Sequence, residues 1–182
     1  MNSWITSDLH FDHANILKYN PATRGVFNDI EHMNSEMKNI WNEKVSPTDL
    51  VYILGDVAFC KPSKAISHVR ALNGRKILIE GNHDSRLVEN DEFRNCFEAV
   101  YTYHEIKHNG HKICMMHYPI SEWNQCHHGS IMLHGHLHGN PSGLTHCRVR
   151  DVGFDATGNV VSLLDDIVND ALTSGIRTHG WK

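Results

Sequence analysis

The sequence predicts an α+β fold, in which helices pack on a mixed β-sheet. Short apolar runs alternate with amphipathic stretches, a pattern typical of layered α and β structure. Two of the runs lie on either side of Asn109-Gly110, which predicts an antiparallel hairpin. At 182 residues and 40% hydrophobic, with no repeat, low-complexity tract or Pro/Gly linker, the chain is expected to form one domain over 1–182.

Three amphipathic stretches predict helices, because their apolar residues recur at three- and four-residue spacing. The first covers 29–45, and the second covers 62–72, before the left-handed stop Asn73-Gly74. The third starts at a capping-box-like pair, Ser162 and Asp165, and is closed by Gly175. Apolar runs predict strands at 4–5, 50–54, 77–79, 100–106, 112–116 and 131–133.

The charge and the cysteines argue against several classes of protein. A formal charge of −4 and a pI near 6.4 do not suggest a broadly basic surface for nucleic acid or anionic lipid. No apolar stretch approaches the roughly 20 residues needed to span a bilayer. The five cysteines lack CxxC spacing and follow a start without a secretory signal. We therefore expect reduced thiols in a cytoplasmic protein.

Potential metal ligands follow five of the apolar runs. They are Asp8 and His10, Asp56, Asn82 with His83 and Asp84, His117, and His136 with His138. Taken singly, each element is commoner as a turn, a surface pair or a structural histidine. Five of them at successive strand ends predict a metal site, because loops converge on ligands at the carboxyl ends of strands. With no thiolate among them, oxygen and nitrogen ligands favour an open site for Mn, Fe, Zn or Ni over a closed structural zinc site.

The order of these motifs resembles that of the calcineurin-like metallophosphoesterases. The motifs are DxH at 8–10, GD at 55–56, GNHD at 81–84, a lone histidine at 117 and GHxH at 135–138. The segments 6–16 and 51–59, together with Arg24, Met33 and 41–42, resemble a small bacterial and phage branch of that family that lacks a cap domain.

The resemblance implies a four-layer αββα sandwich of mixed sheets and two divalent metal ions, with Mn favoured in vitro. One ion would be held by Asp8, His10, Asp56 and His138, and the other by Asp56, Asn82, His117 and His136. A bridging carboxylate such as Asp56 suits two cations about 3.5–4 Å apart, as two-metal hydrolysis requires. The neutral amide of Asn82 leaves more positive charge to attract a phosphate.

The resemblance also implies a mechanism. A hydroxide bridging the ions would attack phosphorus in line, and His83 would stabilise or protonate the leaving oxygen. Asp84 has two interpretations that can both hold: it accepts a hydrogen bond from the His83 imidazole, or it closes the GNHD loop as an Asx-turn. Arg86, Asn15 and Arg24 are candidate substrate contacts, although Arg86 is also interpretable as a surface arginine.

Four other residues near the motifs are not assigned as ligands. Asp12 and His13 are interpreted as turn residues or as hydrogen-bond partners of ligands, and Asp155 as structural or as such a partner. His134 shares the strand parity of His136, but it is expected to pack in the core or to orient a ligand.

The predicted function is metal-dependent hydrolysis of phosphate esters, with phosphodiesters favoured over monoesters. The alternatives are a phosphomonoesterase, a nuclease of the same superfamily, or a non-catalytic metal-binding scaffold. A nuclease would need an extended basic surface, which a charge of −4 does not suggest. A scaffold would be expected to have lost ligands or His83. The expected partner is a small phosphate ester or nucleotide, with no membrane or extended nucleic-acid surface, and the chain is expected to be a monomer or a homodimer.

Overall fold

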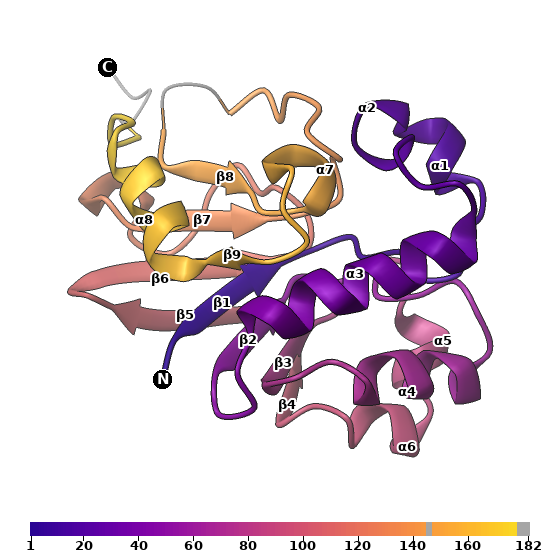
Figure 1. Cartoon of the computed structure of the whole chain (residues 1–182). Coiled ribbons are helices and arrows are strands. Elements are labelled where there is room, and N and C mark those ends of the chain that lie inside the picture. Colours follow the sequence, from indigo (N-terminus) through magenta and orange to yellow (C-terminus); the bar gives the residue numbers. More distant parts are fainter. Residues whose placement is uncertain (145–146, 178–182) are drawn as a thin grey trace.

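A computed structural model describes residues 1–144 and 147–177, and it contains two mixed β-sheets (Figure 1). The first has the order β4-β3-β2-β1-β9, in which β1 to β4 are parallel and β9 is antiparallel to β1. Its strands are β1 (Ser3–Thr6), β2 (Leu50–Ile53), β3 (Arg75–Ile79), β4 (Ala99–Tyr101) and β9 (Ser162–Leu163). The second has the order β5-β6-β7-β8, in which β5 and β6 are antiparallel and the other pairs are parallel. Its strands are β5 (Tyr103–His108), β6 (His111–Met116), β7 (Ile131–His134) and β8 (Val149–Asp151).

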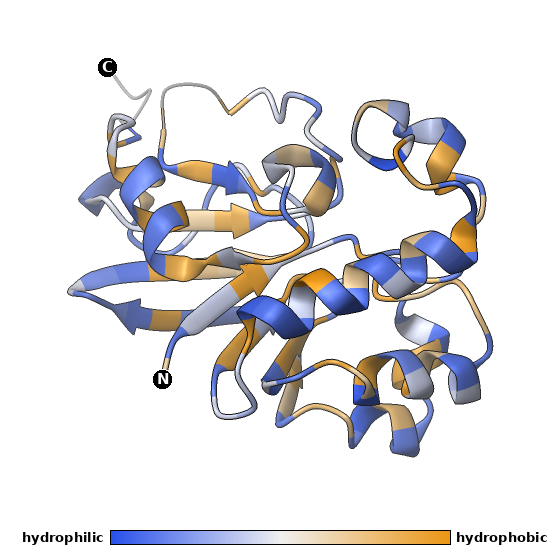
Figure 2. Cartoon of the chain, viewed as in Figure 1, coloured by the Kyte–Doolittle hydropathy of each residue, from blue (hydrophilic) through white to orange (hydrophobic). Residues whose placement is uncertain are grey.

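A hydrophobic core joins the two sheets. Ile5 and Ile79 of the first sheet belong to the same buried cluster as Ile113 and Leu133 of the second. Successive side chains of a strand point to opposite faces, so Ile113 faces this core while its neighbour Cys114 joins a smaller cluster on the outer face. Figure 2 shows hydrophobic residues along β2, β3 and β7. The two mixed sheets are consistent with the predicted α+β class.

Helices α3 (Ile30–Lys44) and α4 (Pro62–Arg70) cover the outer face of the first sheet (Figure 1). At the start of α3, the Asp29 carboxylate accepts a hydrogen bond of 2.8 Å from the His32 backbone N–H, which satisfies one free donor of the helix end. Helix α8 (Leu164–Leu172) buries its apolar face in the core between the sheets and contacts β1, β8 and β9. These helices match the three amphipathic stretches of the sequence.

The remaining helices are short. They are α1 (Ile16–Tyr19), α2 (Pro21–Arg24), α5 (Ser85–Val88), α6 (Asp91–Arg94), α7 (Phe154–Thr157) and the 3-10 turn η1 (Cys126–His128). The outer face of the second sheet is covered by Trp123 and by Cys126 of η1, which pack on Cys114 and Met132. Since this covering layer is largely irregular in the described part of the chain, the four-layer sandwich stays a prediction.

Two sequence-based expectations about the elements were wrong. The expected strand 100–106 is divided, because the chain leaves the first sheet after β4 and enters the second at β5. The turn at Asn109-Gly110 does form, with positive φ at both residues. Ser162 does not cap α8, because it pairs with Ile5 in β9 and leaves Leu163 as the N-cap without a side-chain hydrogen bond.

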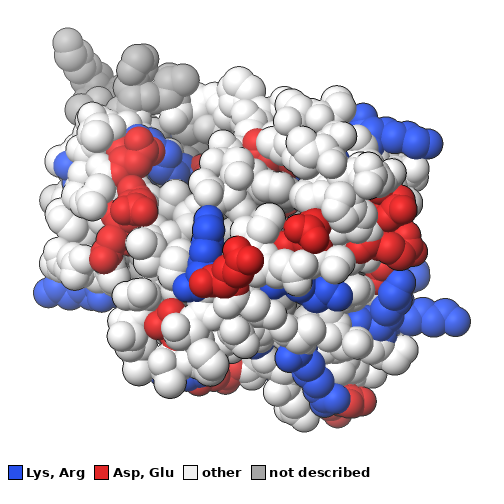
Figure 3. Space-filling view, viewed as in Figure 1, with Lys and Arg blue, Asp and Glu red and all other residues white. Residues whose placement is uncertain are grey.

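The described residues also bear on membrane contact, disulfide bonds and surface charge. In the ranges 1–144 and 147–177, no helix combines the length and apolar character needed to cross a bilayer. The five cysteines are free thiols. Figure 3 shows Lys and Arg side chains interspersed with Asp and Glu on the face in view, so this face has no large region of one charge.

Candidate metal centre

All seven expected ligands lie at one edge of the paired sheets, because each follows the carboxyl end of a strand. From the first sheet, Asp8 and His10 follow β1, Asp56 follows β2 and Asn82 follows β3. From the second sheet, His117 follows β6, and His136 and His138 follow β7. Parallel strands bring their carboxyl ends to the same edge. The structure therefore groups in space the residues that the sequence spreads over 131 positions, from 8 to 138.

A first group of ligand atoms surrounds the imidazole of His10. Its Nε2 lies 3.2 Å from His138 Nε2, 3.8 Å from Asp8 Oδ1 and 3.9 Å from Asp56 Oδ2. Such spacing is what a cation about 2.0–2.2 Å from each atom would produce. Asp8 Oδ1 is buried and has no hydrogen-bond partner among the described residues. A buried carboxylate oxygen without a donor is costly, so this atom fits a metal ligand.

A second group surrounds the Asn82 amide oxygen. Asn82 Oδ1 lies 2.9 Å from His117 Nε2 and 3.0 Å from His136 Nδ1, and His117 Nε2 is 3.6 Å from Asp56 Oδ1. His117 Nδ1 donates a hydrogen bond of 2.6 Å to the Leu54 carbonyl. In a neutral imidazole this leaves Nε2 as an acceptor that faces another acceptor, Asn82 Oδ1. A cation bound by both atoms would remove the repulsion between these two acceptors.

The imidazole of His138 is held in place by the Asp155 carboxylate, which forms a buried ion pair with Arg24. Its Nδ1 donates to Asp155 Oδ2 at 2.7 Å, which leaves Nε2 free to face His10. Arg24 donates to both oxygens of the same carboxylate, with Nε 2.9 Å from Oδ1, and Thr23 donates to it as well. Burial raises the pKa of Asp155, but hydrogen bonds from His138 and Arg24 outweigh it and hold that pKa well below its usual range.

The three candidate substrate contacts occupy different environments. Arg24 is fully buried and also donates to the carbonyls of Asp8 and Leu9, at 2.6 and 3.0 Å. It therefore does not reach a substrate, contrary to expectation, because its guanidinium is used within the protein. Asn15 is exposed before α1 and does not line the ligand cavity. Arg86 is exposed and lines an adjoining cavity.

Asp84 and His83 take separate roles. The buried Asp84 carboxylate accepts hydrogen bonds from the backbone N–H groups of Asp56, Val57 and Gly81, at 2.8, 2.9 and 2.9 Å. Burial raises the pKa of Asp84, which those three donors partly oppose. No described contact joins it to the imidazole of His83, so of the two interpretations the geometry favours loop closure. The His83 imidazole is 45% exposed, with Nε2 3.9 Å from Asp56 Oδ2.

A cavity of about 390 Å³ opens over the ligands. Its lining also includes residues that were not among the predicted site residues, such as Tyr19, Asn20 and Phe59. The Phe59 ring lies between two imidazoles, with its centroid 4.0 Å from that of His13 and 4.3 Å from that of His83. Phe59 follows Asp56 by three residues and ends the segment 51–59 that resembles the family, and these two signals could have identified it. A separate cavity of about 570 Å³ between α7 and α8 is bordered by none of the expected ligands.

Two other residues near the motifs, Asp12 and His134, have clear hydrogen-bond partners. Asp12 accepts hydrogen bonds from Lys64, His68 and Asn34, at 2.7, 2.8 and 2.8 Å, which ties its loop to α3 and α4. His134 is buried, and its Nδ1 donates to the Gly135 carbonyl at 2.8 Å. Burial lowers the pKa of His134. Neither residue takes part in the two groups of ligand atoms.

The ligand loops are conformationally strained. Five expected ligands have left-handed φ values: Asp8 (56°), His10 (52°), Asp56 (55°), His136 (70°) and His138 (50°). Residues other than glycine adopt this region at a cost of about 1–3 kcal/mol each, and such residues cluster at functional sites. The loops also approach very closely, because a Cβ on Gly135 would lie 1.9 Å from Ser7 Oγ and 2.5 Å from Asp8 Oδ2.

Two other proteins are similar in sequence to this chain over most of its length. An uncharacterized protein of Methanocaldococcus jannaschii is 36% identical over 139 residues, which cover 75% of this chain and 69% of that protein. The gene 66 protein of Mycobacterium phage L5 is 30% identical over 200 residues, covering 92% of this chain and 94% of the phage protein. No family model matches the sequence.

Among solved structures, a protein of unknown function from Aquifex aeolicus superposes with a TM-score of 0.67 and 26% identity, covering 85% of this chain and 90% of its own. An archaeal phosphodiesterase is 20% identical with a TM-score of 0.45, covering 75% of this chain and 73% of its own. A Pseudomonas putida nuclease is 19% identical with a TM-score of 0.48, covering 75% and 60%.

Proposed function

This chain belongs to the same protein family as the Methanocaldococcus jannaschii protein and the gene 66 protein of phage L5, and we propose that its metal centre makes it a metal-dependent phosphoesterase of the calcineurin-like type. The observation that carries the proposal is the Asp56 carboxylate between two groups of nitrogen and oxygen atoms. Its Oδ2 lies 3.9 Å from His10 Nε2 and its Oδ1 lies 3.6 Å from His117 Nε2. One carboxylate that faces two such groups suits a two-metal site.

In this proposal Asp8, His10, Asp56 and His138 hold one divalent ion, and Asp56, Asn82, His117 and His136 hold the other. When bound, two such ions supply water activation and neutralise charge on phosphoryl oxygens. Manganese is the first choice of metal, with Fe, Zn and Ni as alternatives, because the donors are nitrogen and oxygen atoms without a thiolate.

The protein side chains bind and orient the ester. The neutral Asn82 contributes a ligand without adding negative charge, so the site keeps its attraction for a phosphate. His83 is exposed on the cavity wall beside Asp56, where its imidazole can hold a proton for the leaving oxygen. The Phe59 ring, which is stacked on His13, packs against the His83 imidazole and limits how it can turn. An open cavity accepts either a diester or a monoester, and phosphodiesters are the favoured substrates.

The proposal is tested with metal-free protein that is reconstituted separately with Mn, Ni, Zn, Fe or Mg. Each form is assayed on bis(p-nitrophenyl) phosphate and on p-nitrophenyl phosphate. We expect metal-dependent turnover, faster on the diester. Absence of turnover with every metal and both esters would contradict the enzymatic proposal.

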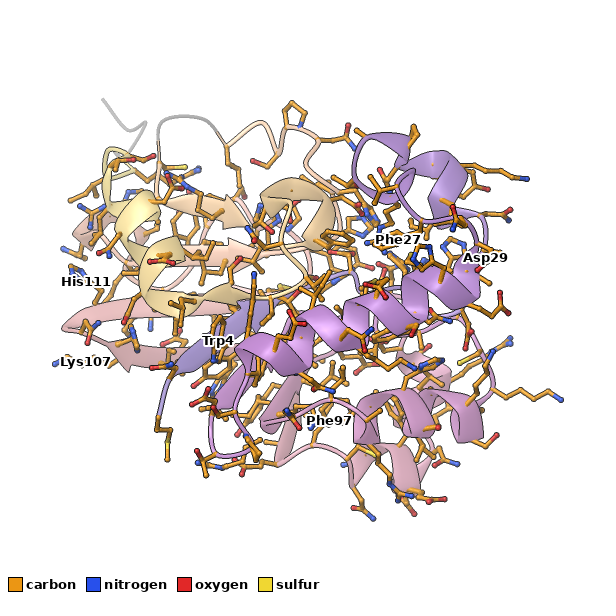
Figure 4. All side chains as sticks on the ribbon, viewed as in Figure 1. Trp4, Phe27, Asp29, Phe97, Lys107 and His111 are labelled. Carbon is orange, nitrogen blue, oxygen red and sulfur yellow. The ribbon has the colours of Figure 1, made fainter. Side chains whose placement is uncertain are left out.

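Two variants separate metal binding from proton transfer. Asp56→Asn is expected to lose bound metal and activity together. His83→Ala is expected to keep its metal and lose about 10²–10⁴-fold in rate, most on esters with a poor leaving group. His111→Ala, at the tip of the β5–β6 hairpin (Figure 4), is the matched control. An equal loss of rate on good and poor leaving groups would remove His83 as the proton donor.

A further inference from the structure

Beside the ligand cavity lies a second cavity of about 530 Å³. The two share three lining residues, Phe59, Asn82 and His83. His83 therefore stands at the boundary, with the expected metal ligands on one side and the second cavity on the other. The two cavities therefore adjoin at these three residues.

The lining of the second cavity is cationic. It includes Lys61, just before α4, and Arg86, in α5, and it contains no Asp or Glu. Burial raises the pKa of the Cys60 thiol, which also lines this cavity, to about 12, so this thiol adds no negative charge. In a chain with 21 acidic residues and a net charge of −4, a lining with two cations and no carboxylate favours an anionic ligand.

Both cations are available for binding. No hydrogen bond or ion pair joins the side chain of Lys61 or of Arg86 to another described residue, and both residues are exposed. The neighbouring Lys64 differs, because its ammonium is 2.7 Å from Asp12 Oδ1. Arg86 adds a planar guanidinium, whose paired donors match the oxygens of a phosphate.

We propose that this second cavity is a subsite for a second phosphate group, which is carried by the leaving group of the substrate and contacted by Lys61 and Arg86. That the second phosphate belongs to the leaving group rests on the proposed function, in which His83 protonates or stabilises the leaving oxygen. It narrows the substrate class to esters that bear a second phosphate next to the scissile one, such as a short phosphorylated oligonucleotide.

The test compares dithymidine phosphodiester with its 5′-phosphorylated and 3′-phosphorylated forms on the metal-loaded enzyme. We expect one terminal phosphate to lower KM by about tenfold. Arg86→Ala and Lys61→Ala should each reduce that preference by roughly three- to tenfold. Arg94→Ala, exposed on α6, and Lys107→Ala, on the β5–β6 hairpin far from α5 (Figure 4), are matched controls that should retain it. Equal KM for all three substrates, or a preference that survives in the Lys61→Ala/Arg86→Ala double variant, would overturn the subsite.

A binding measurement makes this test independent of catalysis. Calorimetric titration of metal-free protein with the phosphorylated dithymidines should show a Kd that rises three- to tenfold in Arg86→Ala and Lys61→Ala and stays constant in the two controls. If the enzyme hydrolyses all three dithymidine substrates with equal KM, the subsite is contradicted and the proposed function is not affected. Failure to hydrolyse any diester or monoester with any metal contradicts the proposed function. The titration then tests the subsite alone: a Kd that depends on Lys61 and Arg86 supports it, and an unchanged Kd contradicts it.

Discussion

Asp155 orients the imidazole of the expected metal ligand His138, although it lies 17 positions further along the chain. Its carboxylate fixes which nitrogen of that imidazole carries the proton, and Arg24 fixes the carboxylate. Such partners of a ligand commonly contribute 10–100-fold to metal affinity. We expect Asp155→Asn to weaken metal binding by about that factor, measured by competition with a chromogenic chelator. Asp165→Asn, exposed on α8, is the control. Unchanged affinity in Asp155→Asn would show that His138 needs no such support.

Arg24 shows why the sequence identified ligands better than their surroundings. Asp8, His10 and His138 follow predicted strands in recognisable motifs, so their position could be inferred from the order of elements. Arg24 lies 131 positions from Asp155, and nothing in the local sequence indicates that α2 and α7 bring them together. A buried arginine and a substrate-binding arginine have the same local pattern, so only tertiary packing separates them.

Asp49 makes the free energy of unfolding depend on pH in the acid range. Its carboxylate accepts hydrogen bonds from Asn2 N–H, Trp4 Nε1 and Ser46 N–H, at 2.7, 3.0 and 3.1 Å, and these donors lower its pKa. A lowered folded-state pKa gives stability that is fully present above the unfolded pKa of about 3.9 and is lost as pH falls through the folded value. We expect Asp49→Asn to be less stable than wild type in urea at pH 5, with the difference shrinking toward pH 2. Glu43→Gln, exposed on α3, should show no such convergence.

At the scale of elements, the loops after the strands depend on close backbone approach. A Cβ at Gly135 would collide with Ser7 Oγ and Asp8 Oδ2, and neither atom can move freely. Ser7 Oγ donates to the Leu54 carbonyl at 2.6 Å, and Asp8 Oδ2 accepts from His136 N–H at 3.0 Å.

Gly135→Ala should therefore destabilise the fold by about 1–3 kcal/mol, as overpacking does, and should also weaken metal binding through Asp8. Urea unfolding and a metal titration measure the two effects. Gly110→Asn is the control, because Asn tolerates its positive φ and a Cβ there meets no atom within 4 Å. A stable Gly135→Ala variant with normal metal affinity would contradict this account of the loop.

Element boundaries were predictable where local pattern and tertiary pairing agree. The stretch 29–45 became α3 because its apolar spacing and the Asp29 cap both favour a helix there. The stretch 100–106 has a continuous strand pattern, but the chain changes sheets between β4 and β5, and alternation along one strand carries no information about its partner. Ser162 resembled a cap, yet its pairing with Ile5 in β9 determined its conformation.

On the scale of the whole molecule, the candidate site joins the two sheets. Asp8, His10 and Asp56 come from the first sheet, whereas His117 and His138 come from the second. Ions held by both sets would connect the sheets at their carboxyl edge, and binding energy that is available only to the folded state adds to stability. The same ions would compensate the strained φ values of the ligand loops and the unpartnered Asp8 oxygen.

Metal loading is therefore expected to raise the unfolding temperature. At a metal concentration 100 times Kd, one site contributes about 2.7 kcal/mol, which for a chain of this size corresponds to roughly 5–11 °C. Differential scanning calorimetry of chelator-treated and Mn-loaded protein measures the shift. Asp56→Asn, which removes the ligand shared by both groups, should lose most of it, while the hairpin control His111→Ala should keep it. If the loaded protein retains its metal and still unfolds at the temperature of the metal-free form, the ions do not connect the sheets, and the strain in the ligand loops must be compensated by packing alone.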